Sequence, residues 1–155
     1  MDQYIHILRN IADRAGVQSL RQIALLPGMK AVLRVTMHYD RIRAASAIVT
    51  LCRARYDEAV VEAVYPGYFN NQPLARQLTL IDYEGFIQEL HKLDFDHLDD
   101  QTNIPFHGVD TWLVERAAGG FLKSVFLVPQ TASGDHARLL KLLRQYLPET
   151  IRELT

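Results

Sequence analysis

The amino-acid sequence predicts an α+β fold, a single domain over residues 1–155 in which a curved antiparallel β-sheet carries helices packed mainly on one face. Three observations lead to this prediction. Apolar residues recur with a helical period near the start, in the middle and at the end of the chain. Runs that alternate like β-strands lie between them. The links between neighbouring strand runs are short, which implies antiparallel pairing.

The helices are expected from apolar stripes and from their capping residues. Ser19 and Gln22 fit a capping box, so a short helix is expected after Ser19. Asp82 stands before a stripe of aromatic and aliphatic residues, and we expect it to cap that helix. The predicted helices are 3–15, 20–26, 83–93 and 135–147.

The strands are expected from alternation and from turn residues. Leu33, Val35 and Met37 fall on one face of residues 30–39, and Arg34 falls on the other, as in a half-buried strand. The pair Gly119-Gly120 is a strong hairpin signal. Strands are predicted at 30–39, 46–56, 58–65, 77–81, 111–117 and 121–128. The expected order is therefore α-(α)-β-β-β-(β)-α-β-β-α.

Composition narrows the class of protein. Hydrophobic residues make up 48% and charged residues 23% of the chain, which is ordinary for a globular protein and excludes a disordered one. No apolar run is long enough to span a membrane, and the start lacks the pattern of a signal peptide, so we expect a cytoplasmic protein. The single cysteine, Cys52, excludes an internal disulfide and a cysteine-based zinc site.

The charges are divided unevenly along the chain. Residues 1–56 hold nine Lys and Arg against three acids, and the rest of the chain holds eight against fifteen. One interpretation is that the basic strands and the acidic segment lie side by side and neutralise each other. The other is a nucleic-acid-binding surface on the arginine-rich strands, for which few interleaved aromatic residues are present. Nucleic acid is therefore not the favoured partner. The arginines in question are Arg34, Arg41, Arg43, Arg53 and Arg55.

Residues 94–115 hold the densest group of acids, with His97 and His107 among them. Such residues suggest a small metal-dependent hydrolase as an alternative function. The calcium-loop pattern fails, because Leu98 stands at its fifth position and Asp99 replaces its glycine. We therefore expect no bound metal.

Motifs of enzymes and of cofactor sites are missing from the sequence. It contains no Gly-x-Ser-x-Gly element and no phosphate-binding glycine loop. We therefore assign no catalytic residue and expect no cofactor.

The leading hypothesis is a non-catalytic module that binds another protein or itself, as a regulator, an immunity-type inhibitor or an assembly factor would. Three aromatic residues surround a tight turn at Tyr65, Tyr68 and Phe69, and exposed aromatic residues often anchor protein interfaces. Arg53 and Arg55 complete the residues that we expect to contact the partner.

One stretch of the chain resembles a known group of proteins. Residues 108–115 read Gly-Val-Asp-Thr-Trp-Leu-Val-Glu, and Gly119-Gly120-Phe121 follow. This resembles a diffuse group of small, uncharacterised bacterial proteins that have Gly, Asp, Trp and Glu in that order on a strand before a glycine-containing hairpin. The resemblance covers about half of the chain. It implies an α+β fold and transfers no activity.

Overall fold

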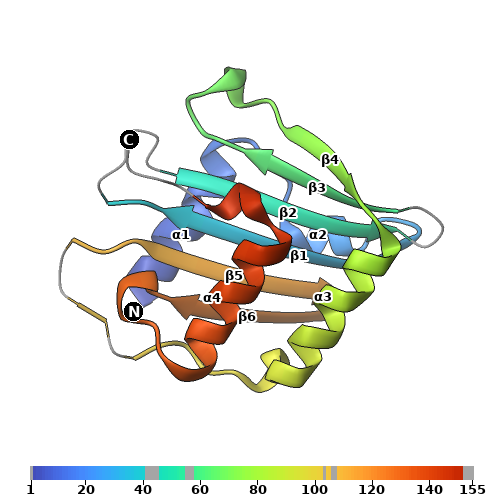
Figure 1. The fold of residues 1–155 in the computed structure, drawn as a ribbon. Coiled ribbons are helices and arrows are strands. Elements are labelled where there is room, and N and C mark those ends of the chain that lie inside the picture. Colours follow the sequence, from blue (N-terminus) through green and yellow to red (C-terminus); the bar gives the residue numbers. More distant parts are fainter. Residues whose placement is uncertain (1, 41–45, 55–57, 103, 106–107, 152–155) are drawn as a thin grey trace.

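The fold is built around one open, twisted β-sheet (Figure 1). The computed structural model describes residues 2–40, 46–54, 58–102, 104–105 and 108–151. All strand pairs are antiparallel, and the order across the sheet is β4-β3-β2-β1-β5-β6. The strands are β1 (Met29–His38), β2 (Ser46–Ala54), β3 (Ala59–Val64), β4 (Leu74–Leu78), β5 (Thr111–Ala118) and β6 (Phe121–Leu127).

Within these described ranges four helices accompany the sheet, which confirms the α+β class and, in outline, the predicted order of elements. They are α1 (Asp2–Arg14), α2 (Leu20–Ala24), α3 (Leu80–Leu93) and α4 (Gly134–Tyr146). Short 3₁₀ segments lie at Phe69–Asn71, Phe95–His97, Pro129–Thr131 and Pro148–Thr150.

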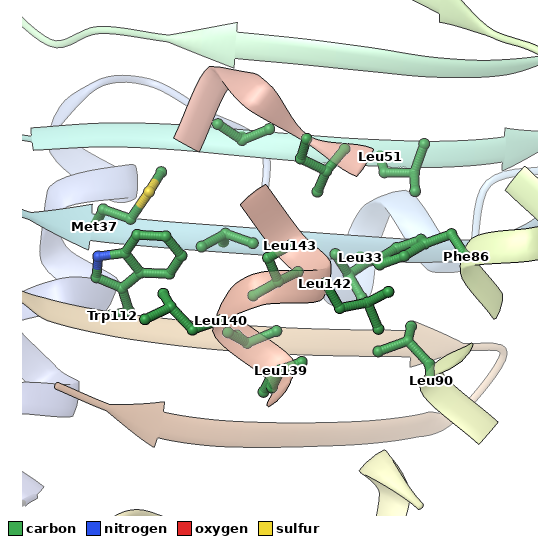
Figure 2. Close-up of a cluster of buried hydrophobic side chains, with 14 of the residues drawn as sticks. Leu33, Met37, Leu51, Phe86, Leu90, Trp112, Leu139, Leu140, Leu142 and Leu143 are labelled. Carbon is green, nitrogen blue, oxygen red and sulfur yellow. The ribbon is translucent and has the colours of Figure 1, made fainter. Parts of the chain in front are cut away.

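The longer pair of helices, α3 and α4, covers one face of the sheet and encloses the largest core cluster. Figure 2 shows the leucines of α4 between Trp112 on one side and Phe86 with Leu90 on the other. Trp112 is completely buried beside Val114 of β5, and Leu127 of β6 is its cross-strand partner. Trp112 is therefore a core residue, as its place in an apolar strand predicts.

The shorter pair, α1 and α2, covers the other face through smaller clusters. Leu8 of α1 packs with Leu113 and Phe126, and Leu20 of α2 packs with Val32. The sheet is thus covered on both sides, and β1 is buried on both faces rather than half-buried. Sequence alternation missed this because the second face of β1 carries the polar residues Arg34 and Thr36, both of which are buried.

The largest local difference from the sequence prediction lies before α3. The fourth strand is expected at 77–81, but β4 ends at Leu78 and α3 begins at Leu80. Thr79, and not Asp82, is the N-cap, because its hydroxyl oxygen accepts a hydrogen bond from the Asp82 amide at 3.2 Å. Ser19 caps α2 as predicted, accepting from the Gln22 amide at 3.2 Å.

Candidate functional site

The link between β3 and β4 is a turn that exposes aromatic side chains. The amide of Tyr68 donates to the carbonyl of Tyr65 at 2.9 Å, and the side chain of Asn71 accepts from the Gly67 amide at 2.7 Å. The ring of Tyr65 is half-buried against the core, whereas Tyr68 and Phe69 are exposed. The turn projects beyond the sheet at the top of Figure 1, where it is accessible to a partner.

Three consecutive residues of this turn adopt left-handed backbone conformations. The φ angles are 53° at Phe69, 56° at Asn70 and 57° at Asn71. Asparagine tolerates this region, but a bulky residue such as phenylalanine occupies it at a cost of roughly 1–2 kcal/mol. The strained backbone holds the Phe69 side chain 61% exposed, with its ring centroid 6.4 Å from that of Tyr65. Strain of this kind concentrates at functional sites.

The two edges of the sheet differ in how their backbone groups are satisfied. Beside β6, the Gln101 amide donates to the Phe126 carbonyl at 2.9 Å, and Asp100 accepts from the Phe126 amide at 2.8 Å. The Gln101 side chain also accepts from the Val128 amide at 3.0 Å. Asp100 and Gln101 therefore cover the end of this edge and prevent further strand pairing there.

The opposite edge, β4, is open in the part of the chain that the structure describes. Its only strand partner there is β3, with a register from Ala59–Leu78 to Ala63–Leu74. Exposed apolar side chains flank it at both ends. Phe69 and Leu74 lie at its start, and Leu80 and Ile81, the latter 84% exposed, follow its end. An open strand edge between apolar anchors is suited to pairing with an extended segment.

An ion pair between Arg76 and Glu149 holds β4 in place. The Arg76 guanidinium donates to both carboxylate oxygens of Glu149, at 2.5 and 2.9 Å, and to the Tyr146 carbonyl at 3.1 Å. The hydrogen bonds to Glu149 raise the pKa of Arg76 further above its ordinary value. This contact ties the edge strand to the end of α4, so the edge is presented by a fixed strand rather than by a loose one.

The expected contact residues are only partly brought together. Tyr65, Tyr68 and Phe69 share one turn, but Arg53 lies at the opposite end of the strands, with its guanidinium carbon 5.8 Å from the centroid of the Tyr83 ring. Arg55 lies outside the described residues. Sequence reasoning missed Leu80 and Ile81, although both fall off the apolar stripe of α3 and could have been identified as exposed.

The acidic segment distributes its carboxylates over separate structural contacts. Asp96 accepts two hydrogen bonds from Arg116, at 2.9 and 2.6 Å. Asp94 lies 2.7 Å from His97 and raises the pKa of that imidazole, and Asp110 accepts from the Asp40 amide at 2.9 Å. Among the described residues, no three His, Cys, Asp or Glu side chains are grouped as a metal site requires. His107, the second histidine of the hydrolase alternative, lies outside them.

The arginines of the predicted basic strands are placed in different environments. Arg34 is 3% exposed, and its guanidinium donates to Thr50 at 3.0 Å and to the Gln18 carbonyl at 2.9 Å. Glu115 of β5 lies opposite Arg34 of β1 in the strand register. The Arg9 guanidinium of α1 lies 3.6 Å from the Glu115 carboxylate. One contact between the basic and acidic halves is thus present. Arg41 and Arg43 lie outside the described residues.

Burial shifts the pKa values of both Arg34 and Glu115. Desolvation lowers the pKa of Arg34, while the negative charge of Glu115 opposes the shift. Desolvation likewise raises the pKa of Glu115, and the charges of Arg9 and Arg34 oppose that shift. Arg9, Arg34 and Glu115 line a hollow of about 320 Å³ beside α1 and α2. Because Arg34 also holds the α1–α2 loop through Gln18, we assign the pair a structural role.

Comparisons with known proteins add no relative. The chain matches no family model and no curated protein sequence. Within the described ranges, every helix is too short or too polar to cross a bilayer.

Proposed function

We propose that this protein is a non-catalytic binding module whose β4 edge receives an extended segment of another protein, in the manner of a regulator, an inhibitor or an assembly factor. The observation that carries the proposal is the contrast between the two sheet edges. Asp100 and Gln101 cover the β6 edge, whereas β4 has no second strand partner among the described residues and lies between exposed apolar side chains. An added strand would satisfy the outward backbone groups of β4.

The surface defines the chemistry of the partner segment. The partner segment would run along Leu74–Leu78 and would donate and accept main-chain hydrogen bonds there. Apolar side chains near its two ends would contact Phe69 and Leu74 at one end and Ile81 at the other. Since Arg76 is already paired with Glu149, a charged side chain opposite the middle of β4 is not required.

The test is a selection of binding peptides from a random library displayed on phage, followed by affinity measurement with each selected peptide. The double variant Phe69→Ser, Ile81→Ser removes both anchors without touching the core. The matched control is Leu25→Ser, which alters a side chain that is 68% exposed at the end of α2. We expect the double variant to lose about tenfold or more in affinity, since buried aromatic anchors typically contribute 2 kcal/mol or more, and the control to bind normally.

Amide hydrogen exchange locates the bound peptide. Protection that appears within Leu74–Leu78 supports the proposal, and protection confined to other elements contradicts it. Sedimentation of the free protein is a second arm of the test. If it is a stable dimer that the double variant dissociates, the β4 edge is a contact between two copies of this chain, and the proposal is wrong.

A further inference from the structure

A second feature lies on the α3 face of the sheet, away from the aromatic turn. A cavity of about 390 Å³ opens where β1 begins and where β2 and β5 end. Leu33 and Leu51 line its floor, and Ile87 of α3 lines its wall. Ala31 and Ala118, both small, leave the space that larger side chains would fill. A concave apolar site of this size is typical of small-molecule binding.

Polar groups converge on this apolar space. Arg53 is stacked against the Tyr83 ring, and Arg116 is oriented by its two hydrogen bonds to Asp96. All three of Tyr83, Arg53 and Arg116 line the cavity. Burial raises the pKa of Tyr83 while the positive charges of Arg53 and Arg116 oppose the shift, which places both guanidinium groups within electrostatic reach of one hydroxyl.

The Tyr83 hydroxyl is the polar group of this cavity that is available to bind a ligand. The residue is 8% exposed, and none of the hydrogen bonds found among the described residues involves its hydroxyl, which water can still reach. A ligand acceptor in the cavity would take this hydrogen bond in place of water. The nearby guanidinium groups favour an acceptor with negative charge.

The charges around the cavity support the same ligand class. Of the residues that the structure describes, Lys30, Arg53 and Arg116 line it together with one acid, Glu84. Arg116 is paired with Asp96 and the Arg53 guanidinium donates to the Ala54 carbonyl, so a ligand anion would share these groups with protein acceptors. The apolar part of the lining, Leu33, Leu51 and Ile87, favours an anion with an organic body over a small inorganic one.

We infer that this cavity binds a small organic anion, with its apolar body on Leu33, Leu51 and Ile87 and its carboxylate or similar group beside Tyr83 and Arg53. The site is separate from the β4 edge and does not depend on the proposed protein partner. It adds a ligand-binding function to the same fold.

The experiment is isothermal titration of the protein with octanoate, below the concentration at which octanoate forms micelles. Octanol and octylamine are the matched probes, since they keep the apolar chain and replace the anionic group. Tyr83→Phe removes only the hydroxyl, and Ala118→Leu fills the cavity. Tyr68→Phe is the control, because it removes an exposed hydroxyl in the distant aromatic turn.

We expect octanoate to bind more tightly than octanol or octylamine. Tyr83→Phe should weaken octanoate about tenfold, the effect of losing one hydrogen bond to a charged group. Ala118→Leu should abolish binding while its thermal unfolding shows a folded protein, and Tyr68→Phe should bind as the wild type does.

The inference would be overturned if octanoate fails to bind at millimolar concentration, if octanol binds as tightly as octanoate, or if Tyr83→Phe and a folded Ala118→Leu variant bind unchanged. The double variant Phe69→Ser, Ile81→Ser should bind octanoate normally. A loss there would mean that the ligand occupies the β4 surface instead, which also contradicts the inference.

Discussion

Replacing Gln101 by alanine tests how the covered edge of the sheet is held. Gln101 is 4% exposed, and its side chain donates to the Thr131 hydroxyl at 2.8 Å and accepts from the Val128 amide at 3.0 Å. Gln101→Ala removes both hydrogen bonds and leaves the Val128 amide without this acceptor. We expect the variant to unfold more easily than the wild type.

The magnitude follows from the groups involved. Each lost hydrogen bond contributes about 1 kcal/mol, and a buried amide left unsatisfied costs a further 1–3 kcal/mol. The expected loss in the free energy of unfolding is therefore about 3 kcal/mol. For a chain of this length, that corresponds to a decrease of roughly 6–12 °C in the melting temperature.

Urea unfolding monitored by circular dichroism measures the loss, and amide exchange at Val128 reports on the edge itself. Gln145→Ala is the control, because Gln145 is exposed on α4 and its replacement should change stability by less than about 0.5 kcal/mol. A loss below about 1 kcal/mol in Gln101→Ala, or a Val128 amide that stays protected, would refute the reasoning.

Three further predictions concern the core, the central charges and the acidic segment. Trp112→Ala should cost about 3–5 kcal/mol, since the ring is completely buried, and native indole fluorescence at the wavelength of solvated tryptophan would contradict this. Burial raises the folded-state pKa of Glu115 above its ordinary value of 4.5, so its contribution to stability is greatest below pH 4.5 and is lost as pH rises through the raised pKa. Wild type should therefore lose stability relative to Glu115→Gln over that window in urea titrations, and a relative gain would show that the sign is wrong. Chelator, calcium or zinc should leave the melting temperature unchanged, since Asp96 and Asp100 serve Arg116 and the Phe126 amide, and an increase of many degrees with one ion would falsify this prediction.

Local patterns in the sequence were sufficient to predict most elements of the fold. The Gly119-Gly120 hairpin connects β5 and β6 as expected, with Gly119 at a φ of 55°. The turn residues that predict a hairpin and the apolar spacing that predicts a helix both depend only on residues that are close together in the sequence. For the same reason Trp112 was identified as a core residue, since it begins an apolar stretch and shares a strand face with Val114.

Only the tertiary structure decided which charges are buried and which edge is open. Arg34 reads as a solvated residue in an alternating strand, but the packing of α1 and α2 on that face buries it. Likewise, the acidic segment reads as a solvated loop or a metal site, whereas Asp100 and Gln101 satisfy backbone groups of β6. The convergence of Arg53, Arg116 and Tyr83 on one cavity joins residues from two strands and a helix. Such contacts depend on the order of strands in the sheet and on where the helices pack. They join residues far apart in the chain, so no local hydrophobic period in the sequence indicates them.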